Sequence, residues 1–270
     1  MSISLSMPSK ISTLTTDFGL KDPYAAEMKA TILTISPNTT IVDITHEIAK
    51  FNIRMGAYML ASAAPYFPKG SVHVAVIDPG VGTKRQPILI QTKQGFFVGP
   101  DNGVLVLAAE KQDITCIHKL SNPQLMLPQV SNTFHGRDIF APAAAHLLNG
   151  VKPAEFGPKI NETAKPEFTK TTLKNGVLTG EVLHVDDFGN IITNINKKEP
   201  TLNHLKSTVT VKLSSSELKL KLCKTYGETK PQEPLTLIGS HGFLEIALNQ
   251  GNAATKFKAK PGDKITISPT

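Results

Sequence analysis

The spacing of hydrophobic residues changes near Gly176, and this change constrains the fold more than any other feature of the sequence. Before this point, short apolar stretches alternate with segments in which apolar residues recur every three or four positions. After it, the chain holds short, β-rich stretches separated by turn residues. A chain of 270 residues is long enough to build two cores. We therefore expect an α/β domain followed by a smaller β domain.

The first part of the chain has the alternation of strands and helices that is typical of a mostly parallel sheet. Apolar stretches predict strands at 11–16, 40–44, 71–77, 88–92 and 96–98. Helical spacing predicts helices at 24–35, 51–59 and 138–148. Strands that alternate with helices indicate βαβ units, which place helices on both faces of a sheet. We assign this α/β domain to residues 1–165.

The last part of the chain predicts a small antiparallel β-barrel-like domain over residues 177–270. The preceding stretch is rich in Pro, Lys and Glu and lacks a clear period, so we interpret 166–176 as a linker. No helix is expected after Gly176. The strands are predicted at 178–185, 190–194, 208–213, 217–223, 235–238, 243–247 and 264–267.

The charge balance gives little support to a nucleic-acid partner. The formal net charge is +7, but the basic residues are spread along the chain and form no arginine stripe with interleaved aromatic residues. This pattern favours a solvated, lysine-rich surface. A basic nucleic-acid-binding protein would instead show affinity that falls steeply with salt.

The cysteines and the apolar runs indicate the compartment. Cys116 and Cys223 lie far apart and outside any CxxC spacing, which predicts neither a metal site nor a disulfide framework and fits a reducing compartment. The first ten residues lack the pattern of a signal peptide, and the apolar runs are too short to span a membrane. We expect a cytoplasmic protein.

Polar residues follow two of the predicted parallel strands. Asp17 follows the first, in the sequence TTDFG, and ligands of open α/β sheets bind beyond the carboxyl ends of strands. It could therefore hold a pair of ribose hydroxyls, or instead cap the next helix. Asp78 and Arg85 share the loop DPGVGTKR after the buried strand, where they could form an ion pair. This loop lacks the complete GxGxxG pattern, so it does not predict a dinucleotide site.

Three further turns carry polar side chains. His135 stands between Phe134 and Gly136, just before a predicted helix, where a histidine can also serve as an ordinary boundary residue. In the β domain, DDFGN at 186–190 and GSHGFLE at 239–245 would each, taken alone, be hairpin turns.

Together these segments resemble the S-adenosyl-L-methionine hydroxide adenosyltransferase family, which is related to the bacterial fluorinase and chlorinase. The resemblance implies an α/β N-terminal domain, a β-barrel-like C-terminal domain and a homotrimer. It also implies a substrate bound between the N-domain of one subunit and the C-domain of its neighbour. It rests on TTDFG (15–19), IVDITHEI (41–48), DPGVG (78–82), VGPDNGVL (98–105), TFHGRD (133–138), VDDFGN (185–190) and LEIALNQGNAA (244–254).

The resemblance assigns roles to residues of both domains. It implies that Asp17 holds the ribose hydroxyls, that Phe51 places a ring against the substrate, and that Phe134 flanks the reaction centre. The methionine part of the substrate would be bound by a set of residues in the second domain. His241 stands where halogenating relatives have an arginine near the substrate carboxylate, so that contact differs here. This implied set is Asp186, Asn190, Ser240, His241 and Glu245.

The hydrolytic branch of the family is marked by an Asp, Arg and His set that matches Asp78, Arg85 and His135. The implied reaction is hydrolysis of S-adenosyl-L-methionine to adenosine and methionine, with attack of water at the ribose 5′ carbon. Methionine leaves as a neutral thioether and needs no acid, so the residues must act on the water. Our hypothesis is that Asp78 orients this water and His135 accepts its proton. S-adenosyl-L-methionine is then a substrate, and no cofactor is expected.

Two alternative functions stay open at this point. Halide-dependent adenosyl transfer is disfavoured, because halogenating relatives have an aromatic residue in place of Asp78 and carry an additional loop. A sensor that binds S-adenosyl-L-methionine or adenosine without turnover would keep Asp17 and Asp186 but would have no use for Asp78, Arg85 and His135.

Overall fold

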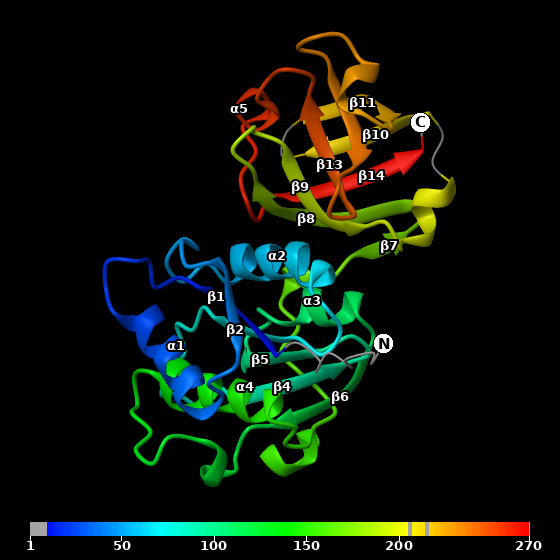
Figure 1. Cartoon of the computed structure of the whole chain (residues 1–270). Helices are drawn as coiled ribbons and strands as arrows, with labels where there is room; N and C mark the ends of the chain where they lie inside the picture. The colour runs from blue at the N-terminus through cyan, green and yellow to red at the C-terminus, as the bar shows by residue number, and fades with distance from the viewer. Residues whose placement is uncertain (1–9, 205–206, 214–215, 270) are drawn as a thin grey trace, which may run out of the picture. The chain divides into compact units, whose positions relative to one another are not determined.

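A computed structural model of the protein describes residues 10–204, 207–213 and 216–269. The chain divides into two compact units, and the boundary lies between Lys165 and Pro166 (Figure 1). Within the described residues, no helix is both long enough and apolar enough to cross a membrane.

The first unit is built on a six-stranded sheet with the order β2-β1-β3-β5-β4-β6. Neighbouring strands are parallel from β2 to β5, and β4 is antiparallel to both of its neighbours. The predicted mostly parallel sheet is confirmed. The strands are β1 (Ile11–Thr16), β2 (Thr40–Thr45), β3 (Val72–Val76), β4 (Pro87–Thr92), β5 (Phe96–Pro100) and β6 (Ile114–Lys119).

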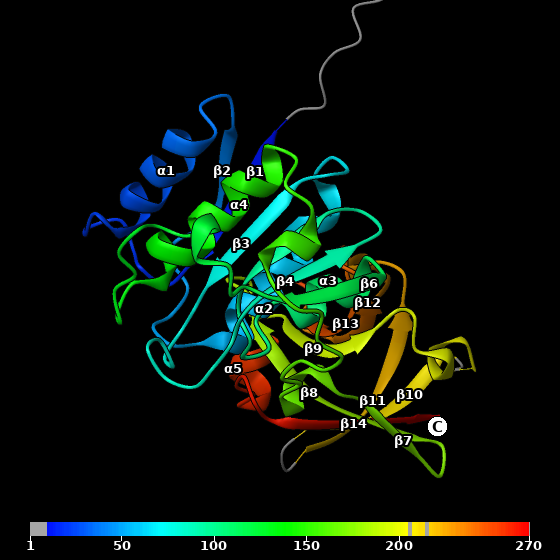
Figure 2. The ribbon, with the colours of Figure 1, turned by 90° about the horizontal axis from the view of Figure 1, so that it is seen from below.

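Helices cover both faces of this sheet (Figures 1 and 2). On one face, α4 packs against α1 and against β1 and β3, and Met28 and Ile32 of α1 share a core with Leu14 and Val74. On the other face, α2 contacts β1 and β2 and packs on α3. The helices are α1 (Tyr24–Ile35), α2 (Ile53–Ala63), α3 (Val106–Lys111) and α4 (Ala141–Leu148).

The structure adds detail that the periodicity did not predict. α3 and β6 were not predicted, and Phe51 precedes α2 because the Asn52 side chain caps that helix by accepting from the backbone N–H of Met55. The predicted helix at 138–148 begins earlier, with a π-helical turn at Gly136–Phe140 that leads into α4.

The second unit is a β-barrel that closes through the pairing of β14 with β8. Seven strands form the closed ring, and β7 pairs with β8 outside it. The inward-facing residues form a core that includes Val182, Ile195, Val211 and Ile246. The strands are β7 (Thr172–Lys174), β8 (Val177–Val185), β9 (Ile191–Asn196), β10 (Thr208–Leu213), β11 (Ser216–Cys223), β12 (Pro234–Ile238), β13 (Phe243–Leu248) and β14 (Lys264–Pro269).

Three expectations about this unit need correction. The barrel is mixed rather than antiparallel, because β11 and β12 are parallel and are joined by a crossover that contains a short 3₁₀ turn instead of a hairpin. Residues 166–176 include β7, which pairs with β8, so this stretch is part of the unit. A short helix, α5 (Ala253–Phe257), follows β13 and is capped by the Asn252 side chain.

Candidate active site

A cavity of about 380 Å³ opens in the first unit where β1 and β3 end. The two strands are parallel neighbours, and their last residues, Thr16 and Val76, are paired, so the loops that follow them start side by side. This volume is in the range of small-molecule sites in proteins. The cavity is lined by Asp17, Phe18, Asp22, Tyr24, Lys50, Phe51, Val76, Asp78, Val81, Thr133, Phe134, His135 and Gly136.

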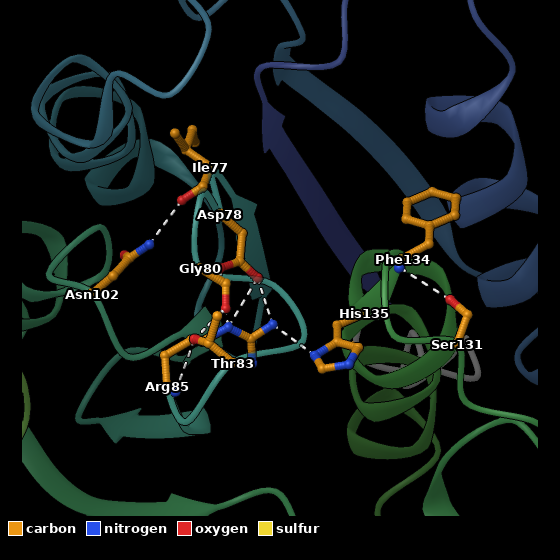
Figure 3. A network of polar contacts seen from close by, with 9 residues as sticks. All are labelled: Ile77, Asp78, Gly80, Thr83, Arg85, Asn102, Ser131, Phe134 and His135. Carbon is orange, nitrogen blue, oxygen red and sulfur yellow. Dashed lines mark hydrogen bonds and ion pairs between the residues drawn. The ribbon is translucent and has the colours of Figure 1, made fainter.

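Asp78 and Arg85 form a buried ion pair beside this cavity (Figure 3). Arg85 Nε lies 3.0 Å from both carboxylate oxygens of Asp78, and Nη2 donates to Oδ2. The side chains are 4% exposed for Asp78 and 9% exposed for Arg85. The Arg85 guanidinium also lies 5.4 Å from the centre of the Phe140 ring. Two charges are stable at this depth only when they are paired and hydrogen-bonded, and Arg85 meets this condition through Nε and Nη2, whereas its buried Nη1 has no hydrogen-bond partner among the described residues.

Arg85 also joins this pair to His135 (Figure 3). Its Nη2 lies 2.7 Å from Nδ1 of His135. A guanidinium only donates, so Nδ1 must accept, and neutral His135 carries its proton on Nε2. Burial and then the charge of Arg85 lower the pKa of His135. A backbone contact with Ser131 and the charges of Asp78 and Asp138 act in the opposite direction without reversing the shift, so His135 is neutral at neutral pH and carries its proton on Nε2.

Two loops bring these three residues together. The backbone of Gly82 passes so close to the second loop that a β-carbon there would lie 2.4 Å from the Asn132 carbonyl oxygen. Its φ of +75° is also a conformation that favours glycine. In the second loop, Ser131 Oγ accepts from the N–H of Phe134, and buried Asp138 accepts from the N–H of Ser131. The π-helical turn follows at Gly136, and such turns are frequent at functional sites.

Asp17 lies in the turn after β1 with its side chain buried. Its Oδ2 accepts from the backbone N–H of Phe51 at 2.8 Å, and its carbonyl oxygen accepts from Lys50 Nζ. The sequence left open whether Asp17 caps the next helix. It does not, because α1 begins after Pro23 with no side-chain cap. Phe51 itself is 69% exposed and has φ +64°, a strained backbone conformation of the kind often found at ligand sites.

Three aromatic rings form one wall of the cavity. The Phe134 ring lies edge-on to Phe18 and Tyr24, with centroids 5.6 Å and 5.2 Å away. The Arg137 guanidinium lies 5.1 Å from the Phe134 centroid on the same cluster. Of these residues, Tyr24 begins the helix that was predicted at 24–35, and the structure shows that it is 44% exposed and lines the cavity.

The structure adds lining residues that the sequence did not single out: Asp22, Lys50, Val81 and Thr133. Lys50 lies directly before Phe51 and two residues after the motif at 41–48. This position beside a predicted site residue is the feature of the sequence that points to Lys50. Within the described residues, no group of three or more His, Cys, Asp or Glu side chains is arranged as metal ligands.

The other predicted residues lie in the second unit. Asp186 and Asn190 share the turn between β8 and β9, where Asp186 Oδ1 accepts from the N–H groups of Phe188 and Asn190. Its Oδ2 accepts from the Asn190 side chain at 2.9 Å. These three bonds hold the Asp186 carboxylate in a fixed orientation.

Ser240 and His241 lie in the turn between β12 and β13, which closes through a bond from Gly242 N–H to the Gly239 carbonyl. Glu245 on β13 is buried against Gly239 and accepts from the Tyr226 hydroxyl at 2.9 Å. Glu245 is 5% exposed, and this burial raises its pKa. Its side chain therefore packs against the turn and does not face solvent.

The pairing of β9 with β13 separates these two turns. Ile246 pairs with Ile191 next to the 186–190 turn, whereas Phe243 pairs with Asn196 next to the 239–242 turn. The structure thus brings Asp186 to Asn190 and Glu245 to Gly239 of the Ser240–His241 turn, and Glu245 is also close enough to Asp186 for that charge to contribute to its raised pKa.

The fold and the cavity define a two-domain protein with a small-molecule site at the carboxyl edge of a mostly parallel sheet. Residues 12–157 match the model of the SAM hydroxide adenosyltransferase N-terminal domain, and residues 180–266 match that of the C-terminal domain. The chain therefore belongs to the SAM hydroxide adenosyltransferase family, as the sequence motifs predicted.

Individual relatives agree with this assignment. The chain is 42% identical over 267 residues to the (R)-S-adenosyl-L-methionine hydrolase of Methanocaldococcus jannaschii, with 95% of each chain covered. The crystal structure of a conserved protein from Thermotoga maritima matches with a TM-score of 0.83 and 40% identity, and covers 96% of this chain and 99% of that one. The fluorinase of an Actinoplanes species is more distant, at 25% identity over 93% of this chain and 95% of its own.

Proposed function

We propose that this protein hydrolyses (R)-S-adenosyl-L-methionine to adenosine and methionine by attack of water at the ribose 5′ carbon. The observation that carries the proposal is the Asp78–Arg85–His135 set at a cavity that also contains Asp17. Membership of the family and the name of the relative from M. jannaschii support the reaction and the epimer.

Substrate binding in the first unit follows from the cavity lining. Asp17 uses one carboxylate oxygen for Phe51 N–H, and its other lone pairs can accept from the two ribose hydroxyls. The exposed Phe51 ring and the wall of Phe134, Phe18 and Tyr24 offer apolar surface to the adenosyl group. The carboxylates of Asp17 and Asp22 also suit a substrate with a positive sulfonium, whereas the charge of Asp78 is balanced by Arg85.

In the reaction, the water oxygen bonds to C5′ while the C5′–S bond breaks, and the bonding electrons stay on sulfur as neutral methionine. His135 was expected from the sequence to accept the proton of the water, but its Nδ1 lone pair faces Arg85. We therefore assign the proton to Asp78, whose Oδ1 accepts only one bond from Arg85. His135 donates from Nε2 to hold the water in line, and Arg85 holds both side chains. S-adenosyl-L-methionine is the substrate, and this chemistry uses no further cofactor.

We further propose that the protein is a homotrimer in which the second unit of a neighbouring copy binds the methionine part of the substrate. Asp186, Asn190, Ser240 and His241 would supply this half of the site, and buried Glu245 would contribute by supporting the turn that carries Ser240 and His241. The support is the family's two-domain organisation and the oriented Asp186 carboxylate, which can receive an ammonium group. A cytoplasmic location is also proposed, on the basis of the two free cysteines.

Product analysis in halide-free buffer tests the function. The pure protein is incubated with the separate (R) and (S) epimers, with and without added chloride or fluoride, and the products are separated by chromatography. We expect equal amounts of adenosine and methionine, formed faster from the (R) epimer and unaffected by halide. A 5′-halo nucleoside would instead show halide-dependent transfer, and tight binding without products would show a sensor.

A further inference from the structure

The turn that carries Asp17 packs against the segment directly after β2. His46 of that segment makes the hydrogen bonds between the two. His46 is 3% exposed, and its Nδ1 lies 2.8 Å from the Thr16 hydroxyl oxygen. The same Thr16 oxygen accepts from the N–H of Phe18 at 3.2 Å. The His46 carbonyl oxygen accepts from the N–H of Gly19 at 2.8 Å. His46 thus contacts the residues on both sides of Asp17.

The other end of the His46 ring faces Asp43. Its Nε2 lies 3.1 Å from Asp43 Oδ1, and Lys29 is paired with the other oxygen of that carboxylate. Burial would raise the pKa of Asp43, but the contacts with Lys29 and His46 outweigh it and hold this pKa below its ordinary value. A charged carboxylate at this position favours a proton on Nε2 of His46, which leaves Nδ1 to accept from the Thr16 hydroxyl. The 3.1 Å contact between Nε2 and Asp43 lacks the geometry of a hydrogen bond, so the ordered hydrogen bonds run from Phe18 through Thr16 to His46, and Asp43 acts on the ring through its charge.

We propose that Asp43, His46 and Thr16 position the Asp17 carboxylate for recognition of the ribose hydroxyls. This inference rests on the proposed function, in which Asp17 binds the ribose. The chain of contacts locks the backbone at Thr16, Phe18 and Gly19, so the Asp17 side chain between them has one orientation. His46 and Asp43 do not line the cavity, so they act through Asp17 and are positioning residues.

The chain contains a matched control pair. On the same strand β1, the Thr13 hydroxyl lies 2.9 Å from Nδ1 of His73 on β3, and both side chains are buried. This is the same type of bond in the same sheet. Thr13 lies three residues before Thr16, and neither Thr13 nor His73 lines the cavity. Substitutions at this pair remove an equivalent core bond and leave the Asp17 turn in place.

The test compares two variants of His46 that each keep one half of its contacts. An Asn side chain puts its amide near the position of Nδ1, so His46→Asn can still bond Thr16. A Gln side chain reaches the position of Nε2, so His46→Gln keeps Asp43 and loses Thr16. Thr16→Val removes the shared hydroxyl without changing the shape of the side chain. The controls are His73→Gln and Thr13→Val, and thermal midpoints are recorded for all five variants.

The readout is binding of adenosine and of 2′-deoxyadenosine to the full-length protein, measured by calorimetry. If Asp17 accepts hydrogen bonds from the ribose, the wild type should bind adenosine at least about tenfold more tightly than 2′-deoxyadenosine, because hydrogen bonds to a charged group are strong. The ratio of the two dissociation constants is the quantity compared among the variants. This ratio should fall to roughly twofold in His46→Gln and Thr16→Val, and should persist in His46→Asn and in both controls. A purely structural role of His46 would weaken both ligands equally and leave the ratio unchanged.

The outcomes separate the two proposals. A wild-type ratio that persists in Thr16→Val and His46→Gln overturns the positioning role and leaves the assignment of Asp17 intact. A wild type that binds the two nucleosides equally overturns the role of Asp17 itself. If His46→Gln does not fold, Thr16→Val decides the question, because valine has the shape of threonine.

Discussion

At the scale of single residues, the site depends on which nitrogen of His135 carries the proton. Arg85 donates to Nδ1, so the ring presents Nε2–H, and Asp78 is the carboxylate that can accept a proton. The residue types were predictable from the sequence, because Asp78 and Arg85 lie in the loop DPGVGTKR and His135 lies in the motif TFHGRD. Their division of labour was not, because a tautomer depends on a contact between residues 50 positions apart in the chain.

Substitution of the two candidate acceptors should separate their roles. Asp78→Asn removes the proton acceptor, and we expect kcat to fall by roughly 10²–10⁴ with little change in KM. His135→Gln places an amide N–H near the position of Nε2 and should retain more activity than His135→Asn, which cannot reach the water. Steady-state kinetics with the (R) epimer measure both effects. Equal loss in the two His135 variants, with an active Asp78→Asn, would contradict this assignment.

The lowered pKa of His135 predicts how activity depends on pH. Protonation puts a hydrogen on Nδ1, which then repels Arg85 and breaks the bridge to Asp78. Because this pKa is below its ordinary value of about 6.5, kcat should stay constant through neutral pH and fall only at more acidic values. Arg85→Met removes a charge that lowers the pKa, so its residual activity should begin to fall at higher pH. If the pH at which kcat falls is the same in Arg85→Met as in the wild type, the contact of Arg85 with His135 does not set this pH dependence.

At the scale of elements, the site is made by two loops that meet at Gly82 and Asn132. Of the elements that support the site, β1, α1 and β3 were predictable because they have regular apolar spacing, whereas β6, the strand before the second loop, was not predicted. The missed elements lack such a signal. α3 has only six residues, the π-helical turn depends on its tertiary contacts, and the parallel β11–β12 pair depends on a crossover rather than a turn motif.

Gly82→Ala tests the contact between the loops. A β-carbon at this position would lie 2.4 Å from the Asn132 carbonyl, so the loops must separate and Arg85 must move from His135. A shift of about 1 Å in a reacting group can cost about 10² in rate, and we expect a loss of kcat of this order. Gly70→Ala is the control, because Gly70 has a similar φ of +89° but open space around it. Equal kcat in the two variants would show that the close approach does not matter.

At the scale of the whole molecule, the proposed reaction needs residues from both units. The reaction centre lies in the first unit, and the residues proposed to bind methionine lie in the second. Two domains of different class were predictable because the apolar spacing changes near Gly176. The oligomer was expected only from the family resemblance, because an interface between copies leaves no periodic signal in one sequence.

A mixture of two inactive variants tests whether copies share their sites. Asp78→Asn inactivates the first unit, and Asp186→Ala is expected to weaken methionine binding in the second. If neighbouring copies share sites, each site combines the first unit of one copy with the second unit of its neighbour. In an equal mixture each of these units is unsubstituted in about half of the copies, so random reassembly should restore about a quarter of the wild-type activity. Activity is measured before and after dissociation and remixing, and the mass by light scattering. A monomer, or no recovery from a remixed trimer, would contradict the shared site.

Transfer of oxygen from water to the ribose 5′ carbon tests the central claim most directly. The protein is given (R)-S-adenosyl-L-methionine in ¹⁸O-labelled water, and both products are weighed by mass spectrometry. Attack by water at C5′ predicts one ¹⁸O atom in the 5′-hydroxyl of each adenosine and none in methionine. Label in methionine, or adenosine formed without label, would contradict the account.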